Sequence, residues 1–224
     1  LFPYTTLFRS YGSTESSPHS LVRLNDTREH TEETDGCAVD GVEIRVVDDA
    51  RHEVPHGQEG EEASRGPQVF VGYWGEPEMT ARALDADGWY YSGDYCRTDS
   101  EGRYIRITGR KKDIIVRGGE NISSREVEDI VLEYPGVREA AVVAMPDERL
   151  GERSCACVSM RPGAPALHLT DLVAFFDGRR VAKYKFPEYL VVLDALPRTS
   201  SGKLQKFALA RMVRERVAAG QPSD

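Results

Sequence analysis

The first half of the chain carries short runs of alternating apolar and polar residues, interrupted repeatedly by glycine, proline and aspartate. Alternation with a period of two is typical of strands with one buried face. The pattern predicts strands at 42–47, 68–73, 89–92 and 104–108, and a short helix at 77–84. We therefore expect a small strand-rich module that ends near Gly109.

The pattern changes after Gly109, where helical and extended periodicities alternate along the chain. Ser123-x-x-Glu126 is a capping box, and the apolar residues that follow it recur at helical spacing. Together these signals predict helices at 124–134, 170–177 and 204–216, with strands at 113–116, 137–145, 154–160 and 189–193. Such an alternation favours a small α/β or α+β domain over 110–217, followed by a short tail, 218–224.

Composition and charge exclude several classes of protein. The 224 residues are 40% hydrophobic and 29% charged, which is typical of a globular chain, and we find no apolar run long enough for a membrane span. The net charge of −8 argues against a general nucleic-acid binder. Residues 11–108 carry a net charge of −12 and residues 109–224 one of +3, so the basic second half suggests that it handles an anion.

The cysteines do not form a metal-binding pattern. Cys37, Cys96, Cys155 and Cys157 include no C-x-x-C pair and no histidine at ligand spacing. We expect reduced thiols of a cytoplasmic protein, with Cys155 and Cys157 in one strand.

The first ten residues, Leu1–Ser10, differ from the rest of the chain. They are apolar and aromatic without a basic lead, so they are neither a secretory signal nor a membrane anchor. They resemble the in-frame translation of a common sequencing-library adapter. We expect residues 1–10 to be foreign and the natural upstream part of the protein to be missing.

Two segments in the first half combine groups that suit a nucleotide. Tyr11–Glu15 (YGSTE) offers a ring for a base, hydroxyls for phosphate oxygens and a carboxylate for Mg²⁺. Ser92-Gly93-Asp94 presents a carboxylate beside a glycine, and one carboxylate can accept both hydroxyls of a ribose. Taken singly, each segment is better explained as an ordinary turn.

Two further segments lie in the basic half. Gly109–Asp113 (GRKKD) stands at the change of composition. Leu196–Lys203 (LPRTSSGK) lacks the first glycine and the final hydroxyl of a phosphate-binding loop, so it is not a Walker loop. Its lysine could still reach a phosphate from a flexible turn, although an exposed loop lysine is the simpler interpretation.

The order and spacing of these segments resemble those of the acyl-adenylate-forming enzymes, which include acyl-CoA synthetases, luciferases and peptide-synthetase adenylation domains. The matching runs cover nearly all of 11–217: YGSTES, GYWGEPEMTARAL, DGWYYSGDYCRTDSEGRY, ITGRKKDIIVRGGENISSREVEDI, PDERLGER and LPRTSSGKLQK. At closer range the chain is similar to bacterial short- and medium-chain fatty-acid–CoA ligases. The resemblance implies the end of a large AMP-binding domain over 11–109 and a small C-terminal lid domain over 110–217.

The resemblance also implies roles for residues of the first module. Tyr11 would stack on adenine, Thr14 would contact the α-phosphate, and Glu15 would help to hold Mg²⁺. Gly12 falls where the family lines its acyl pocket. Asp94 would accept the two ribose hydroxyls of the nucleotide, and Arg110 would assist it.

In the second module the resemblance implies a hinge at Lys112, a CoA-tunnel glycine at Gly119 and a catalytic lysine at Lys203. ATP and a fatty acid would form an acyl-adenylate and pyrophosphate, with Lys203 stabilising the transition state. Rotation at Lys112 would then bring CoA to the adenylate.

The resemblance is incomplete, because the family's glycine- and hydroxyl-rich phosphate loop and most of its acyl pocket are absent from these residues. We therefore expect a C-terminal piece that is inactive alone. Two alternatives stay open: adenylation of an aryl or amino acid with transfer to CoA or a carrier protein, and a non-catalytic nucleotide-binding piece. No carrier-protein serine motif follows Arg216, which weighs against transfer to a carrier.

Overall fold

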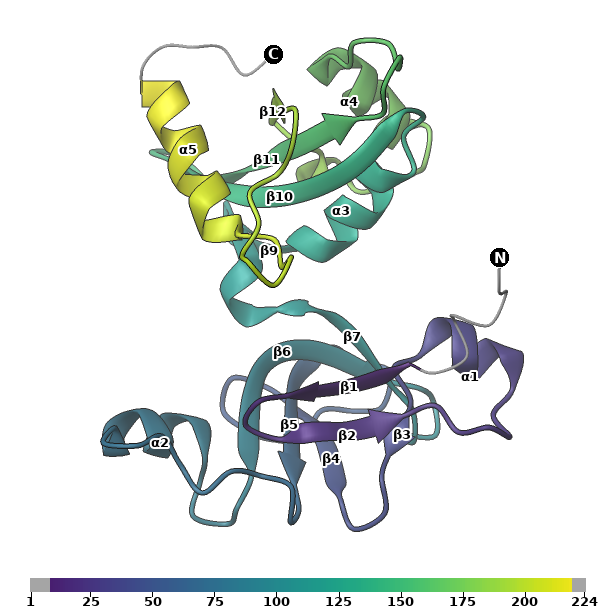
Figure 1. Ribbon diagram of the computed structural model, residues 1–224, viewed down its shortest axis with the longest axis vertical. Coiled ribbons are helices and arrows are strands. Elements are labelled where there is room, and N and C mark those ends of the chain that lie inside the picture. Colours follow the sequence, from purple (N-terminus) through teal and green to yellow (C-terminus); the bar gives the residue numbers. More distant parts are fainter. Residues whose placement is uncertain (1–8, 219–224) are drawn as a thin grey trace. The chain divides into compact units, whose positions relative to one another are not determined.

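The computed structural model describes residues 9–218 (Figure 1). The chain divides into two compact units between Lys111 and Lys112. We call residues 9–111 unit 1 and residues 112–218 unit 2. The expected fold class, a strand-rich module followed by an α/β module, is confirmed.

Unit 1 is built mainly from antiparallel strands in two sheets, ordered β1-β2-β3 and β4-β5-β6-β7. Its elements are β1 (Ser10–Ser13), β2 (Ser17–Leu21), α1 (Arg28–Glu33), β3 (Cys37–Ala38), β4 (Glu43–Val47), β5 (Gly60–Arg65), α2 (Pro77–Ala83), β6 (Tyr90–Thr98) and β7 (Ile105–Arg110). Consecutive strands of each sheet are neighbours, so the connections are local. Val47, Ala63, Trp89 and Tyr91 form a small buried cluster on the larger sheet.

Unit 2 is a mixed sheet with helices on both faces (Figure 1). Its elements are the 3₁₀ turn η1 (Lys111–Asp113), which begins at the unit boundary, β8 (Ile114–Arg117), β9 (Glu120–Ser123), α3 (Ser124–Leu132), β10 (Val137–Asp147), β11 (Gly151–Met160), α4 (Leu169–Asp177), η2 (Lys183–Lys185), β12 (Tyr189–Val192) and α5 (Lys206–Ala218). β10 pairs with one edge of β11 along its whole length, while the parallel β12 and, at Gly151, β8 pair with its other edge.

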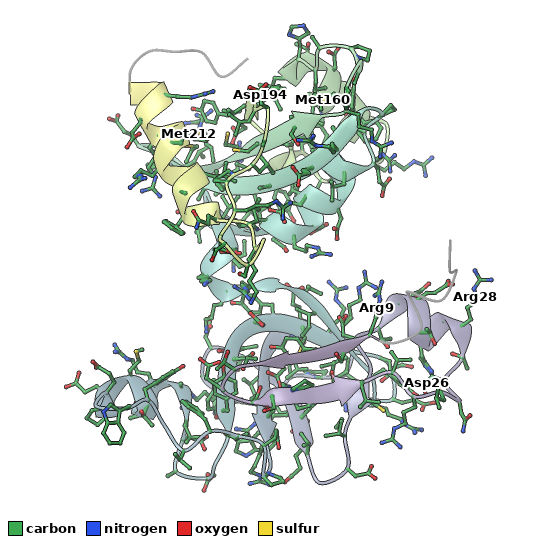
Figure 2. All side chains as sticks on the ribbon, viewed as in Figure 1. Arg9, Asp26, Arg28, Met160, Asp194 and Met212 are labelled. Atoms are coloured by element: carbon green, nitrogen blue, oxygen red, sulfur yellow. The ribbon has the colours of Figure 1, made fainter. Side chains whose placement is uncertain are left out.

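Alternation along the central strands of unit 2 divides its core in two. Val142, Ala156 and Leu190 pack with α3 and α4, whereas Val143, Cys157 and Val191 pack with Leu209 and Val213 of α5. Met160 and Met212 mark these two clusters in Figure 2. Because both faces are buried, the strands read as nearly continuous apolar runs.

The helix expected at 124–134 is α3, and Ser123 caps it by accepting a hydrogen bond from the amide of Glu126. The strands expected at 42–47, 104–108, 113–116 and 137–145 are found with small shifts at their ends. The strand at 89–92 extends as far as Thr98.

The strand predicted at 68–73 is wrong. This segment is irregular, because its amides bond to isolated partners rather than to a neighbouring strand: Phe70 donates to the carbonyl of Glu15 and Tyr73 to the hydroxyl of Thr80. Val71 and Trp74 are fully exposed. Apolar alternation alone therefore gave the wrong element here.

The two ends of the chain lie largely outside the described residues. Of the ten residues expected to be foreign, only Arg9 and Ser10 are described, and Ser10 is already part of β1. At the other end Ala218 closes α5, while 219–224 are outside the described range. Among the helices of residues 9–218, none is long and apolar enough to span a bilayer.

Candidate active site

Asp94 projects from a bulge in β6. Ala63 of β5 pairs with Tyr91, and Glu61 pairs with Tyr95, so Ser92, Gly93 and Asp94 together face the single residue Glu62. Bulges of this kind re-aim side chains near functional sites. Gly93 takes the left-handed conformation that the bulge requires, with φ +72°.

Three of the predicted site residues meet at this bulge. The hydroxyl of Tyr11 in β1 donates to Asp94 Oδ2 at 2.8 Å, although the two residues are far apart in sequence. Arg110 stands opposite Asp94 in the ladder between β6 and β7, and its Nε lies 3.4 Å from Asp94 Oδ1. The Asp94 side chain is 16% exposed. A ring, a carboxylate and a guanidinium therefore converge at the surface of unit 1.

A buried contact between a histidine and a carboxylate, which lies beneath Tyr11, was not predicted from the sequence. His19 Nε2 lies 3.1 Å from Glu62 Oε1, and both side chains are completely buried. Ser16 Oγ contacts the other ring nitrogen at 3.0 Å. The His19 ring meets Tyr11 edge-on, with centroids 5.2 Å apart. The signal for this pair was weak, because a histidine in a short strand and one acid among many are unremarkable in sequence.

Burial and charge shift the ionisation of these groups. Burial would lower the pKa of His19, but the hydrogen bond and charge of Glu62 raise it above its ordinary value. Burial, with the charges of Glu62 and Asp94, holds the pKa of Tyr11 well above its usual range. Tyr11 therefore remains a neutral hydrogen-bond donor to Asp94.

Thr14 and Glu15 lie in the turn that joins β1 to β2. Thr14 is exposed, and Glu15 Oε1 accepts a hydrogen bond of 3.0 Å from the hydroxyl of Tyr73. Burial alone would raise the pKa of Glu15, but hydrogen bonds from its own amide and from Tyr73 lower it overall. Glu15 is thus an ionised carboxylate at neutral pH.

Glu15 is the residue that the resemblance assigns to Mg²⁺. Within residues 9–218, no cluster of three or more histidine, cysteine or acidic side chains could hold a metal. Mg²⁺ commonly binds through one or two carboxylates, with phosphate oxygens and water as its other ligands. Glu15 therefore suits an ion that arrives with a nucleotide rather than a resident metal.

Gly12 has a structural reason to be glycine. A Cβ at this position would overlap the carbonyl oxygen of Ser17 and lie 2.6 Å from the Cα of Pro18, which faces Gly12 across the β1-β2 hairpin. The close approach of the two strands is enough to require glycine. Its expected place in an acyl pocket stays a prediction.

In unit 2, Gly119 lies in the tight turn between β8 and β9. Its φ is +91°, and a Cβ built there would meet no atom within 4 Å. The turn is fixed from behind, because Arg117 bonds Glu188 through two nitrogens at 2.9 and 3.0 Å, and the amide of Gly118 donates to Leu150. Gly119 therefore has free space at its Cβ position, while the adjoining end of β8 is held by the ion pair of Arg117 with Glu188.

Lys203 stands on an ordered turn. The amide of Lys203 donates to Thr199 Oγ1 at 3.0 Å, and the amide of Thr199 donates to the carbonyl of Lys203 at 2.8 Å. Arg198 closes the base of the turn by bonding both the carbonyl of Gly202 and the carboxylate of Glu139. The Lys203 side chain is exposed, so a hydrogen-bonded turn presents its cation to solvent.

The boundary between the units falls next to the expected hinge. Lys111 is the last residue of unit 1 and Lys112 the first of unit 2, two residues beyond the boundary expected from the change of pattern at Gly109. Lys112 is exposed and lies within η1.

Comparison with protein families gives one match that overlaps each unit. Residues 1–74 match the AMP-binding enzyme family, and residues 126–203 match the AMP-binding enzyme C-terminal domain. The first match contains Tyr11, Gly12, Thr14 and Glu15, and the second ends at Lys203.

Comparison with individual proteins gives the same result. The chain is 64% identical over 211 residues to the medium-chain fatty-acid–CoA ligase of Escherichia coli, a match that covers 94% of this chain and 37% of the relative. ATP-bound MatB from Rhodopseudomonas palustris is similar in structure, with a TM-score of 0.86 and 34% identity over 93% of this chain and 41% of that one.

A third relative carries a reaction intermediate. The o-succinylbenzoate CoA synthetase MenE of Bacillus subtilis, solved with an acyl-adenylate, has a TM-score of 0.79 and 29% identity over 90% of this chain and 40% of that one. The chain thus spans well under half the length of these relatives. Its two family matches and its 64% identity to a curated ligase show that it belongs to the AMP-binding enzyme family.

Proposed function

We propose that this chain is part of an AMP-forming fatty-acid–CoA ligase that activates a medium-chain fatty acid with ATP. The observation that carries the proposal is the meeting of Tyr11, Asp94 and Arg110 at the β6 bulge, in a chain 64% identical to a medium-chain ligase. Four free, buried cysteines fit a reducing compartment, so we further propose that the enzyme is cytoplasmic.

The first half-reaction forms the acyl-adenylate. An oxygen of the fatty-acid carboxylate attacks the α-phosphorus of ATP, the bond to the β-phosphate oxygen breaks, and pyrophosphate leaves. In this proposal Tyr11 stacks on adenine, while Asp94 accepts the ribose hydroxyls with help from Arg110. The Tyr11 hydroxyl donates to Asp94 Oδ2, so the ring and the ribose-binding carboxylate are held together in this proposal.

Charge at the phosphates is handled by three other residues. Thr14 contacts the α-phosphate from the β1-β2 turn, and Glu15 beside it holds the Mg²⁺ that accompanies ATP. The ion neutralises phosphate charge when it is bound. Lys203 adds a positive charge to the developing transition state from its exposed turn.

The second half-reaction transfers the acyl group. The CoA thiolate attacks the acyl carbon, the bond from that carbon to the phosphate oxygen breaks, and AMP leaves. Rotation about Lys112 exchanges the Lys203 turn for the β8-β9 turn at the adenylate. The left-handed φ and open surroundings of Gly119 support a role beside pantetheine, since a side chain there would obstruct it.

A chimeric ligase tests this proposal. Residues 11–218 of this chain would replace the corresponding part of the E. coli relative, and we refer to the product as the chimera. We expect the chimera to form octanoyl-CoA from octanoate, ATP and CoA, with release of pyrophosphate.

The isolated 224-residue chain is the matched control. It contains no phosphate loop, and catalysis by positioning is lost when much of the constellation is absent. We expect no octanoyl-CoA from this chain alone. An inactive chimera that still binds AMP would instead favour a non-catalytic nucleotide-binding module.

A further inference from the structure

Glu61 makes two contacts that connect distant parts of unit 1. It lies near the start of β5, and its side chain is only 13% exposed. One carboxylate oxygen, Oε1, accepts a hydrogen bond of 3.0 Å from the amide of Gly93. The other, Oε2, lies 3.1 Å from Nζ of Lys111.

The first contact holds the β6 bulge. A bulge leaves backbone groups without a partner in the ladder, and a poorly solvated amide needs an acceptor from elsewhere. Glu61 supplies that acceptor to Gly93, the residue directly before Asp94. Ser92 Oγ reinforces the bulge by donating to the carbonyl of Glu62 at 3.0 Å. The direction of the Asp94 side chain therefore depends on the Glu61 carboxylate.

The second contact holds the last residue of unit 1. Lys111 Nζ lies 2.7 Å from Asp49 Oδ1 as well as 3.1 Å from Glu61 Oε2. Asp49 is 84% exposed, so its pairing with Lys111 is weakened by solvent, whereas Glu61 is largely shielded. Glu61 is thus the shielded partner of Lys111 and Asp49 the exposed one, and Lys112 is the next residue along the chain.

We propose that Glu61 is a positioning residue that joins the Asp94 bulge to Lys111, so that rotation of the chain is confined to Lys112. This inference rests on the proposed function, in which Asp94 binds ribose and Lys112 is the hinge. One side chain would then maintain the nucleotide site and fix the point at which the hinge begins.

Three substitutions separate the two contacts. Glu61→Gln keeps an oxygen acceptor for Gly93 but removes the negative charge from Lys111. Lys111→Met removes the same pair from the other side, and Glu61→Ala removes both contacts. Asp49→Asn is the matched control, because it alters only the exposed partner of Lys111.

The first measurement uses the 224-residue chain and does not depend on activity. Amide hydrogen exchange at Gly93, followed by NMR, should quicken at least about tenfold in Glu61→Ala, because the bulge loses its acceptor. It should stay within about twofold of the parent in Glu61→Gln and Lys111→Met. Unchanged exchange in Glu61→Ala would overturn the first half of the inference.

The second measurement uses the chimera. Glu61→Gln and Lys111→Met should leave the KM for ATP in pyrophosphate exchange within about twofold, while slowing acyl-CoA formation from supplied acyl-adenylate by about fivefold. Glu61→Ala should also raise the KM for ATP by about tenfold. A purely structural role predicts equal losses in both half-reactions with a lower Tm, and that result would overturn the inference.

The outcomes for the two proposals are distinct. An inactive parent chimera would refute the proposed function, while the exchange data would still decide whether Glu61 holds the bulge. An active parent whose Glu61 and Lys111 variants retain both half-reactions would refute only the role of Glu61.

Discussion

Lys206, the first residue of α5, places its Nζ 2.7 Å from Oε1 of Glu128 in α3. Glu128 is only 8% exposed, and the same oxygen accepts a hydrogen bond of 2.7 Å from the amide of Val142. Lys206 also lies 3.5 Å from Asp113, the residue after Lys112. The base of the Lys203 turn is therefore tied to the helix, sheet and entry segment of unit 2.

Removing the Lys206 cation should destabilise unit 2. Lys206→Met leaves the buried Glu128 carboxylate without its paired cation, and breaking such a pair costs about 3 kcal/mol. Hydrogen exchange of amides in β10 and β11 would measure the free energy of unfolding. Both tryptophans, Trp74 and Trp89, lie in unit 1, so tryptophan fluorescence would serve as the internal control and should not change.

The loss of stability in Lys206→Met should be larger at higher pH. Burial raises the pKa of Glu128 above its ordinary value of 4.5, and Lys206 opposes that shift. A carboxyl with a raised folded-state pKa contributes stability that is present below 4.5 and is lost as pH rises through the folded-state value. Removing Lys206 raises that value further, so Lys206→Met should cost more at about pH 7.5 than at about pH 5. An equal cost at both values would show that Glu128 does not carry the effect.

Lys203 should matter to adenylation alone. In the chimera, Lys203→Ala should slow pyrophosphate release by about 10²-fold, the scale of losing one donor to a transition state. Acyl-CoA formation from supplied acyl-adenylate should be nearly unchanged. Lys183→Ala, which removes another exposed lysine of unit 2, is the control. If both half-reactions fell together, Lys203 would have only a structural role.

The hinge can be tested by fixing its backbone. Lys112→Pro restricts φ at residue 112 and disfavours the helical conformation of Lys111 before it. In the chimera we expect adenylate formation to persist and thioester formation to be blocked, because one orientation is trapped. Lys112→Ala, which keeps backbone freedom, should support both steps. Separate assays of pyrophosphate and acyl-CoA would decide, and equal losses in Lys112→Pro would contradict two orientations.

The Asp94 carboxylate should determine nucleotide affinity. Asp94→Asn weakens two hydrogen bonds to ribose and leaves Arg110 without its anion, so the KM for ATP in pyrophosphate exchange should rise by about 10- to 100-fold. Tyr11→Phe keeps the ring but loses the 2.8 Å bond to Asp94, and a rise of about fivefold is expected. If the Tyr11→Phe effect equalled that of Asp94→Asn, the hydroxyl rather than the carboxylate would dominate binding.

Local signals predicted unit 2 better than unit 1. The Ser123 cap and helical spacing specified α3, and apolar runs specified β10 and β11, because each of these elements buries a face that its own sequence displays. The segment 68–73 shows the same kind of alternation without being a strand. Its backbone partners, Glu15 and Thr80, lie elsewhere in the chain and leave no trace in the local pattern.

The resemblance to a known family predicts the site residues, but the sequence does not predict the contacts that they make with one another. Nothing local indicates that Tyr11 bonds Asp94, or that three residues of β6 face one residue of β5. The buried pair of His19 and Glu62 was missed for the same reason, since pairing across sheets depends on register. Gly12 shows a further limit, because its glycine is explained by the backbone of Ser17 before any ligand is considered.

The position of α5 after every strand of unit 2 affects how this unit is completed during synthesis. Leu209 and Val213 cover the sheet face that carries Cys155 and Cys157, whereas α3 and α4 on the opposite face are made earlier. Because a nascent chain emerges from its N-terminus, this face of the sheet stays uncovered until α5 docks. During that interval unit 2 is most prone to aggregation, and the free thiols of Cys155 and Cys157 are most exposed to oxidation.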